Sequence, residues 1–137
     1  MDRRITVLIA DDDQYRLRFL PKICQRLGCR VETATDDKEI IGRLAEAAFD
    51  CIVVHVTLLD IVTAQLDRVT QTTGSRPVVV GTTSRVIDVD QRGKLFQVGD
   101  KLLATGTVDV FLRQPISSED LELALDQVQS LIAKRCP

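Results

Sequence analysis

The stretch ITVLIADDD, residues 5–13, decides how the chain begins to fold. Its first six residues are mostly apolar and rich in β-branched side chains, which is typical of a buried strand. The three aspartates that follow indicate a polar turn. Apolar residues then recur at helical spacing from Leu17 to Leu27, just before Gly28. The first thirty residues therefore predict a strand, a turn and a helix.

The same alternation repeats along the chain. Further strands are predicted at residues 30–35, 51–55, 77–82 and 108–112. The run at 51–55 is apolar on both faces until its last residue, His55, which is the only histidine. Because strands that are apolar on both faces belong to sheets covered on both sides, the sheet is expected to be parallel.

Helices are predicted between these strands. One begins at Asp36, a candidate N-cap, and Glu39 three residues later completes a capping box. Another is expected to begin with Asp60 as its cap. The segment 88–104 has a weaker helical pattern because it contains two glycines, and Ser117-Ser118 is expected to open the final helix.

Five strand–helix units with right-handed crossovers leave few possible topologies. We predict an α/β fold, a doubly wound five-stranded parallel sheet of the flavodoxin type with strand order 2-1-3-4-5 and an extended fourth-helix region. The 137 residues suit a single domain spanning 1–137.

Composition excludes several classes of function. The net charge is −2, and acidic and basic residues are mixed along the chain, so neither nucleic acid nor a membrane surface is an expected partner. The four cysteines, Cys24, Cys29, Cys51 and Cys136, have no C-x-x-C spacing, and the N-terminus shows no apolar signal stretch. These features predict a reduced, cytoplasmic protein.

Polar residues follow several of the predicted strands. Asp11 to Asp13 follow the first strand, and His55, Thr82 and Gln114 lie at the ends of the third, fourth and fifth. The carboxyl ends of parallel strands meet at one edge of the sheet, where doubly wound folds carry their functional sites. We therefore expect these side chains to share one crevice.

Four motifs together resemble bacterial response-regulator receiver domains of the CheY-like type. They are VLIADDD at 7–13, FDCIVV at 49–54, PVVVGT at 77–82 and FLRQP at 111–115. No single motif is specific, but all four occur in order and span nearly the whole chain. The resemblance implies a module of a two-component phosphorelay system and the fold predicted above.

The resemblance also implies a set of site residues. Receivers hold a magnesium ion with acidic residues after strand one and accept a phosphoryl group from a histidine kinase on an aspartate after strand three. Asp11 and Asp12 match the metal-holding acids. Thr82 matches the hydroxyl position, and Phe111 matches the aromatic switch position. Metal and a lysine would neutralise charge on the transferring phosphoryl group.

This chain departs from the pattern at the reactive positions. His55 stands where the acceptor aspartate is expected, and the neutral Gln114 stands where the lysine is expected. Arg113 does not replace that lysine, because neighbouring side chains on a strand point to opposite faces. The segment between Thr82 and Pro115 is also longer than is usual in receivers.

An alternative register makes Asp60 the acceptor. Thr82 follows Asp60 by only 22 positions, which must hold a loop, a helix, a second loop and most of a strand, whereas it follows His55 by 27 positions. The spacing favours His55 as the residue at the acceptor position.

His55 then has three conceivable roles. Its imidazole could form a charge-assisted hydrogen bond with Asp11 and Asp12, fill the place of the metal and fix the loop. Two carboxylates and an imidazole could instead bind a transition metal such as zinc or manganese. Formation of phosphohistidine is disfavoured, because neither a lysine-type charge nor a clear base supports it.

The sequence therefore predicts a pseudo-receiver, which is not an enzyme and needs no cofactor. It would act by contact with protein partners, such as a histidine kinase or a downstream signalling protein, and could form a homodimer through the fourth-helix, fifth-strand and fifth-helix face. The insertion at 88–107 would create or block a partner site. The alternative is a phosphorylatable response regulator that accepts a phosphoryl group from a histidine kinase on Asp60, with Mg²⁺ held by Asp11 and Asp12.

Overall fold

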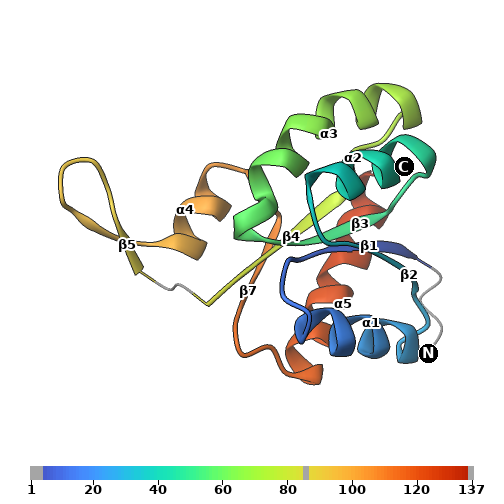
Figure 1. The fold of residues 1–137 in the computed structure, drawn as a ribbon, viewed down its shortest axis with the longest axis horizontal. Coiled ribbons are helices and arrows are strands. Elements are labelled where there is room, and N and C mark those ends of the chain that lie inside the picture. The colour runs from blue at the N-terminus through green and yellow to red at the C-terminus, as the bar shows by residue number, and fades with distance from the viewer. Residues whose placement is uncertain (1–4, 85–86, 136–137) are drawn as a thin grey trace.

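Five parallel strands form the central sheet of the computed structural model, which describes residues 5–84 and 87–135. The strands are β1 (Thr6–Ala10), β2 (Arg30–Ala34), β3 (Cys51–His55), β4 (Val78–Thr83) and β7 (Val110–Arg113). Their order across the sheet is β2-β1-β3-β4-β7, as Figure 1 shows. Because β7 is the fifth strand of this sheet, the predicted order 2-1-3-4-5 is confirmed.

Helices cover both faces of the sheet. They are α1 (Arg16–Arg26), α2 (Asp37–Glu46), the 3-10 turn η1 (Val56–Leu58), α3 (Leu59–Thr73), α4 (Val98–Ala104) and α5 (Ser118–Arg135). Helices α1 and α5 lie on one face, and α2 and α3 lie on the other (Figure 1). The architecture is the doubly wound α/β fold that the sequence predicts.

The core has two halves because side chains alternate across each strand. On β1, Val7 and Ile9 pack with α1 and α5, while Leu8 and Ala10 pack with α2 and α3. Every residue of β3 is buried. Strands β1, β3 and β4 therefore run through the packed core, and their carboxyl ends emerge from it at one edge of the sheet.

Two of the predicted helix starts are confirmed, and one is wrong. The Asp36 carboxylate accepts a hydrogen bond from the Glu39 N–H at 2.8 Å, and the Ser117 hydroxyl accepts one from the Asp120 N–H at 3.0 Å. Asp60 is not an N-cap, because η1 runs directly into α3 and the helix begins at Leu59, a buried residue of the core. Asp60 instead lies in the first turn, where its charge suits the helix dipole.

The prediction of one helix over 88–104 is wrong. Residues 87–97 form an antiparallel hairpin of β5 (Ile87–Val89) and β6 (Leu95–Gln97), and only the short α4 follows. The Asp90 carboxylate accepts hydrogen bonds from the Arg92 and Lys94 N–H groups at 2.8 and 2.9 Å, and Gly93 has φ 78°. This turn chemistry outweighs a helical pattern that the glycines already weaken.

Cys24 and Cys51 are buried free thiols, Cys29 is also buried, and Cys136 lies outside the described residues. Burial raises the pKa of the Cys24 thiol to about 12. Within residues 5–84 and 87–135, no helix is long and apolar enough to cross a bilayer.

Candidate functional site

The structure brings the predicted site residues to one edge of the sheet. Asp11 directly follows β1, His55 is the last residue of β3, and Gln114 directly follows β7. In the parallel register, Ala10 is paired with Val54 and His55 is paired with Thr82 of β4. The crevice expected from the sequence is therefore formed by the carboxyl ends of four adjacent strands.

An arginine that the sequence analysis did not single out dominates this crevice. The Arg16 Nε donates to Asp11 Oδ2 at 2.7 Å, and its second terminal nitrogen donates to Asp11 Oδ1 at 2.9 Å. Asp11 is 1% exposed, and the Arg16 side chain is 17% exposed. A two-point contact of this kind is a strong charge-assisted interaction, and it raises the pKa of Arg16.

Asp13 positions that arginine at the start of α1. Its Oδ1 accepts hydrogen bonds from the Tyr15 and Arg16 N–H groups at 2.8 and 3.1 Å. Its other carboxylate oxygen lies 3.5 Å from the Arg16 guanidinium. The acidic triplet therefore starts the helix and aims its first side chain back over the end of β1.

Gln114 completes the arrangement. Its Oε1 accepts a hydrogen bond from Arg16 Nη1 at 3.0 Å, so the guanidinium bridges β1 and the residue after β7. A lysine at this position would place a second positive charge against Arg16. The neutral glutamine can therefore accept the hydrogen bond from Arg16 without charge repulsion. The positive charge of the crevice comes from Arg16 of α1 instead of from the loop after β7.

His55 is nearly buried, with 8% of its surface exposed. Its Nδ1 accepts a hydrogen bond from the Thr57 N–H at 3.3 Å and lies 2.8 Å from Thr57 Oγ1. Thr57 in turn donates to Asp12 Oδ2 at 3.3 Å. Burial lowers the pKa of His55, although the nearby aspartates oppose that shift. The ring is therefore neutral at pH 7 and is joined to Asp12 through Thr57.

The residues do not fit a receiver's magnesium ion. Mg²⁺ requires hard oxygen ligands in octahedral geometry. Here both Asp11 oxygens are held by Arg16, and an imidazole replaces the third carboxylate. Ligand atoms of Asp11, Asp12 and His55 lie within 4.8 Å of one another, a mixed nitrogen and oxygen set that suits transition metals better. Any such metal would first have to displace Arg16 from Asp11.

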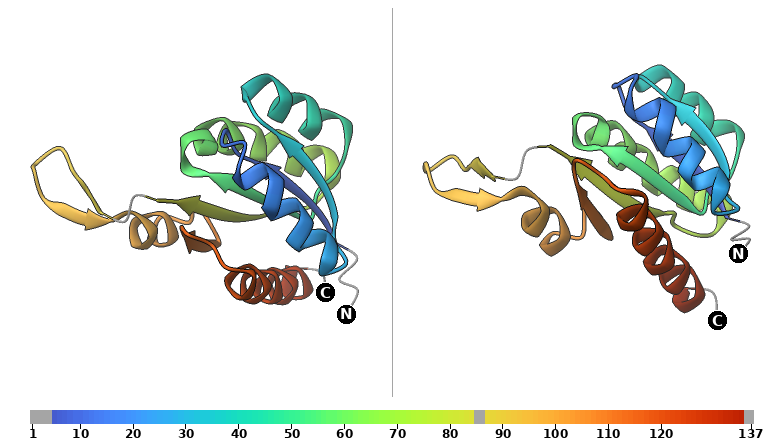
Figure 2. Two further views of the ribbon diagram at one scale, coloured as in Figure 1. Left: turned by 60° about the horizontal axis from the view of Figure 1, so that its bottom comes forward. Right: turned by 90° about the horizontal axis from the view of Figure 1, so that it is seen from below.

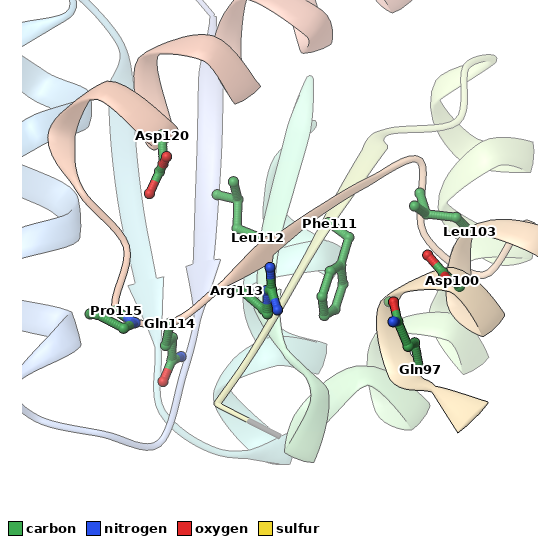
Figure 3. A pocket seen from close by; sticks show the side chains of 10 residues that line it. Gln97, Asp100, Leu103, Phe111, Leu112, Arg113, Gln114, Pro115 and Asp120 are labelled. Atoms are coloured by element: carbon green, nitrogen blue, oxygen red, sulfur yellow. The ribbon is translucent and has the colours of Figure 1, made fainter. Parts of the chain in front are cut away.

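Thr82 and Phe111 are the two remaining site residues predicted from the sequence. Thr82 is 1% exposed, and its buried Oγ1 has no hydrogen-bond partner among the described residues. Phe111 is partly buried and packs against the core half that contains α2 and α3. It borders a cavity of about 590 Å³ between β7, α4 and the start of α5, with Gln97 and Asp100 on the α4 side (Figure 3).

Gly99 gives the Phe111 ring its space. A Cβ at Gly99 would lie 2.5 Å from Cδ2 and 2.6 Å from Cε2 of Phe111. We expect Gly99→Ala to cost about 1–3 kcal/mol of unfolding free energy from overpacking, against about 1 kcal/mol gained in helix propensity. Urea denaturation would measure the net loss.

Two control variants separate the cost of overpacking from the gain in helix propensity. A Cβ at Gly42 of α2 would meet nothing within 4 Å, so Gly42→Ala should stabilise by the propensity term alone. In a Phe111→Ala background, Gly99→Ala should likewise become stabilising. If it remains destabilising there, Phe111 is not the group that requires glycine.

Asp60, the alternative acceptor, is exposed on the first turn of α3. It borders a cavity of about 460 Å³ whose lining also includes His55, Thr57, Thr83 and Asp88. It therefore lies near the crevice, but on a helix instead of at a strand end.

Comparison with known proteins supports this architecture. No protein-family model matches the sequence, and neither does any curated protein. Among solved structures, the chain is similar to the chemotaxis response regulator CheY4 of Vibrio cholerae, with 21% identity, a TM-score of 0.68, and coverage of 91% of this chain and 98% of that one. It is also similar to the signal receiver domain of an HD domain-containing protein from Pseudomonas fluorescens, with 20% identity, a TM-score of 0.72, and coverage of 96% and 99%.

A third similar structure is the co-crystal of the histidine phosphotransfer protein Ypd1 and the receiver domain of its downstream response regulator Ssk1 from Saccharomyces cerevisiae. The identity is 15% and the TM-score is 0.66, with 89% of this chain and 86% of that one covered. The fold of this chain is thus that of response-regulator receiver domains. What the chain does with that fold depends on the chemistry of its crevice.

Proposed function

We propose that this chain is a receiver-like signal-transduction module that acts through protein contacts and does not use an aspartyl phosphate. The observation that carries the proposal is the two-point contact between Arg16 and buried Asp11, which Gln114 extends to the far side of the crevice. A receiver crevice needs its acidic residues free to hold a metal. In this chain an internal cation already neutralises them.

The reactive positions support the same conclusion. His55 offers a neutral imidazole whose Nδ1 is engaged with Thr57, so no carboxylate nucleophile stands at the end of β3. Among the described residues, Arg16 supplies the positive charge in contact with Asp11 and Gln114, and it cannot follow a transferring phosphoryl group without breaking those contacts. We therefore expect the described part of the crevice to give little of the charge stabilisation that phosphoryl transfer requires.

The partners we propose are proteins of a two-component pathway in the cytoplasm. The Ypd1–Ssk1 co-crystal joins a receiver domain to a histidine phosphotransfer protein. A chain that keeps the fold but has lost the acceptor could still bind such a partner, a histidine kinase or a downstream protein. It would then transmit a signal by binding to the partner instead of by transferring a phosphoryl group.

One observation favours a second candidate function, a phosphorylatable regulator that uses Asp60. That carboxylate is exposed and borders the same cavity as His55. Against it, Asp60 lies in the first turn of α3, away from the strand-end positions of Asp11 and Gln114.

Phosphoryl uptake distinguishes the two candidates. We expect no acid-labile phosphate on the natural chain after incubation with labelled acetyl phosphate and Mg²⁺, while a receiver with an intact aspartate is labelled in parallel. Label that disappears in Asp60→Asn would establish the second candidate. Label that survives in Asp60→Asn but is lost in Asp11→Asn or Asp12→Asn would show that the crevice remains reactive and would overturn the proposal.

A further inference from the structure

The β5–β6 hairpin, residues 87–97, extends away from the body of the molecule. It is inserted between β4 and α4, and it stands outside the central sheet as a separate two-stranded sheet. Figures 1 and 2 show it projecting beyond α4 in all three views. We call this segment the arm.

The two faces of the arm are unlike each other. In the antiparallel register, Val89 is paired with Leu95 and Ile87 with Gln97, so the three apolar residues share one face. Ile87, Val89 and Leu95 are 54%, 52% and 66% exposed. This face is therefore both apolar and uncovered.

The opposite face carries the paired residues Asp88 and Phe96. The Lys101 ammonium of α4 lies 4.5 Å from the centre of the Phe96 ring, and Asp88 borders the cavity beside His55. The arm thus turns a charged residue toward the body and its aliphatic residues toward solvent. That is the reverse of the pattern by which a strand pair buries its apolar face against its own domain.

Such an arrangement needs an external cover. A lone two-stranded hairpin is marginally stable in water, and burial of an apolar face is what normally stabilises it. Contiguous exposed apolar side chains with a polar rim are typical of interaction sites.

The charges of the arm indicate which partner packs against its apolar face. Its tip carries Asp90, Arg92 and Lys94 and has a net charge of +1, whereas its base, where it joins α4, carries Asp88, Asp100 and Lys101 and has a net charge of −1. The arm itself carries two acidic and two basic residues, so it is neutral although the chain has a net charge of −2. Two arms laid antiparallel would place the net positive tip of each, with Arg92, against the net negative base of the other, with Asp100.

We infer that a second copy of this chain covers the arm, through antiparallel packing of the two apolar faces about a twofold axis. Such an interface is self-complementary in shape and in charge, as a twofold contact requires. It differs from the dimer face expected from the sequence, because it is centred on the inserted arm and not on β7 and α5. It is also independent of the proposed loss of phosphoryl chemistry.

Molecular mass in solution tests the inference. Because the apolar patch is small compared with a standard interface, we expect a dimer that forms between about 10 µM and 1 mM. Sedimentation equilibrium should show this rise in mass for the natural chain. The double variant Ile87→Thr, Leu95→Thr should remain monomeric, since threonine keeps β propensity but removes apolar surface.

A matched control is Leu123→Thr, which removes an equally exposed leucine, 64% exposed, from α5. It should leave the dimer unchanged. A natural chain that stays monomeric up to 1 mM would overturn the inference, as would a dimer that only Leu123→Thr dissociates.

Charge exchange tests the antiparallel arrangement. Arg92→Glu should weaken the dimer at least about tenfold by facing Asp100 with a like charge. Adding Asp100→Arg to that variant should restore the dimer to within about threefold of the natural chain. If the second substitution gives no recovery, the tip and base do not meet and the antiparallel dimer is wrong. Circular dichroism on each variant would verify that the fold is intact.

Discussion

Replacement of Arg16 by alanine is expected to lower the free energy of unfolding by about 3 kcal/mol, a large fraction of the stability of a domain this size. The physical reason is the isolation of Asp11, which is 1% exposed and has both carboxylate oxygens paired to the guanidinium. Removing one partner of a buried ion pair leaves an uncompensated charge. Urea denaturation at pH 7 would measure the loss.

Two controls make this prediction specific. Arg18 is an exposed arginine on the same helix, and Arg18→Ala should change the free energy of unfolding by less than about 0.5 kcal/mol. Adding Asp11→Asn to Arg16→Ala should recover part of the loss, because it removes the buried charge. An Arg16→Ala loss no greater than that of Arg18→Ala would mean that Arg16 does not neutralise the crevice.

The second large effect concerns restoration of a receiver crevice. The triple variant Arg16→Gln, His55→Asp, Gln114→Lys frees Asp11, supplies a carboxylate at the end of β3 and returns a cation to the position after β7. We expect it to gain a Mg²⁺-dependent response to beryllium fluoride, a phosphoryl mimic, that the natural chain lacks.

The intermediate variants identify the residue that blocks the chemistry. His55→Asp alone should respond weakly or not at all, because Arg16 would still hold both oxygens of Asp11. Adding Arg16→Gln to it should produce the first clear response. A full response from His55→Asp alone would show that the acceptor position, and not the internal cation, is what matters.

Much of the fold could be predicted because strong local signals agree with the global topology. The apolar runs at β3 and β4 are buried on both faces, which only the centre of a parallel sheet provides. The ends of those runs also placed His55 beside Thr82, a pairing that the register shows. Periodicity therefore located the edge of the sheet as well as its strands.

The arm was missed because two patterns compete in the same segment. Ile87, Asp88, Val89 and Asp90 alternate with a period of two, which is a strand signal, and Gly93 supplies the positive φ of a turn. The leucines farther along suggested one helical face, and that interpretation extended the helix too far. The start of α3 was displaced for a different reason, since burial of Leu59 outweighed the capping preference of Asp60.

Arg16 was missed because a single arginine on a helix usually lies on a solvated face. The available signal was one departure from the receiver pattern together with a nearby arginine. A glutamine stands where a lysine is expected, and an arginine follows the acidic triplet within one helical turn. The structure connects the two through the 3.0 Å contact between Arg16 Nη1 and Gln114 Oε1.

The most direct test of a crevice held in one state is an amide chemical-shift titration of the natural chain, first with Mg²⁺ and then with beryllium fluoride, with the triple variant as the positive control. We expect the natural chain to show no saturable shifts while the triple variant responds. Saturable shifts around Asp11, Asp60 and Thr82 in the natural chain would contradict the proposal and would mean that the domain still switches on a phosphoryl group.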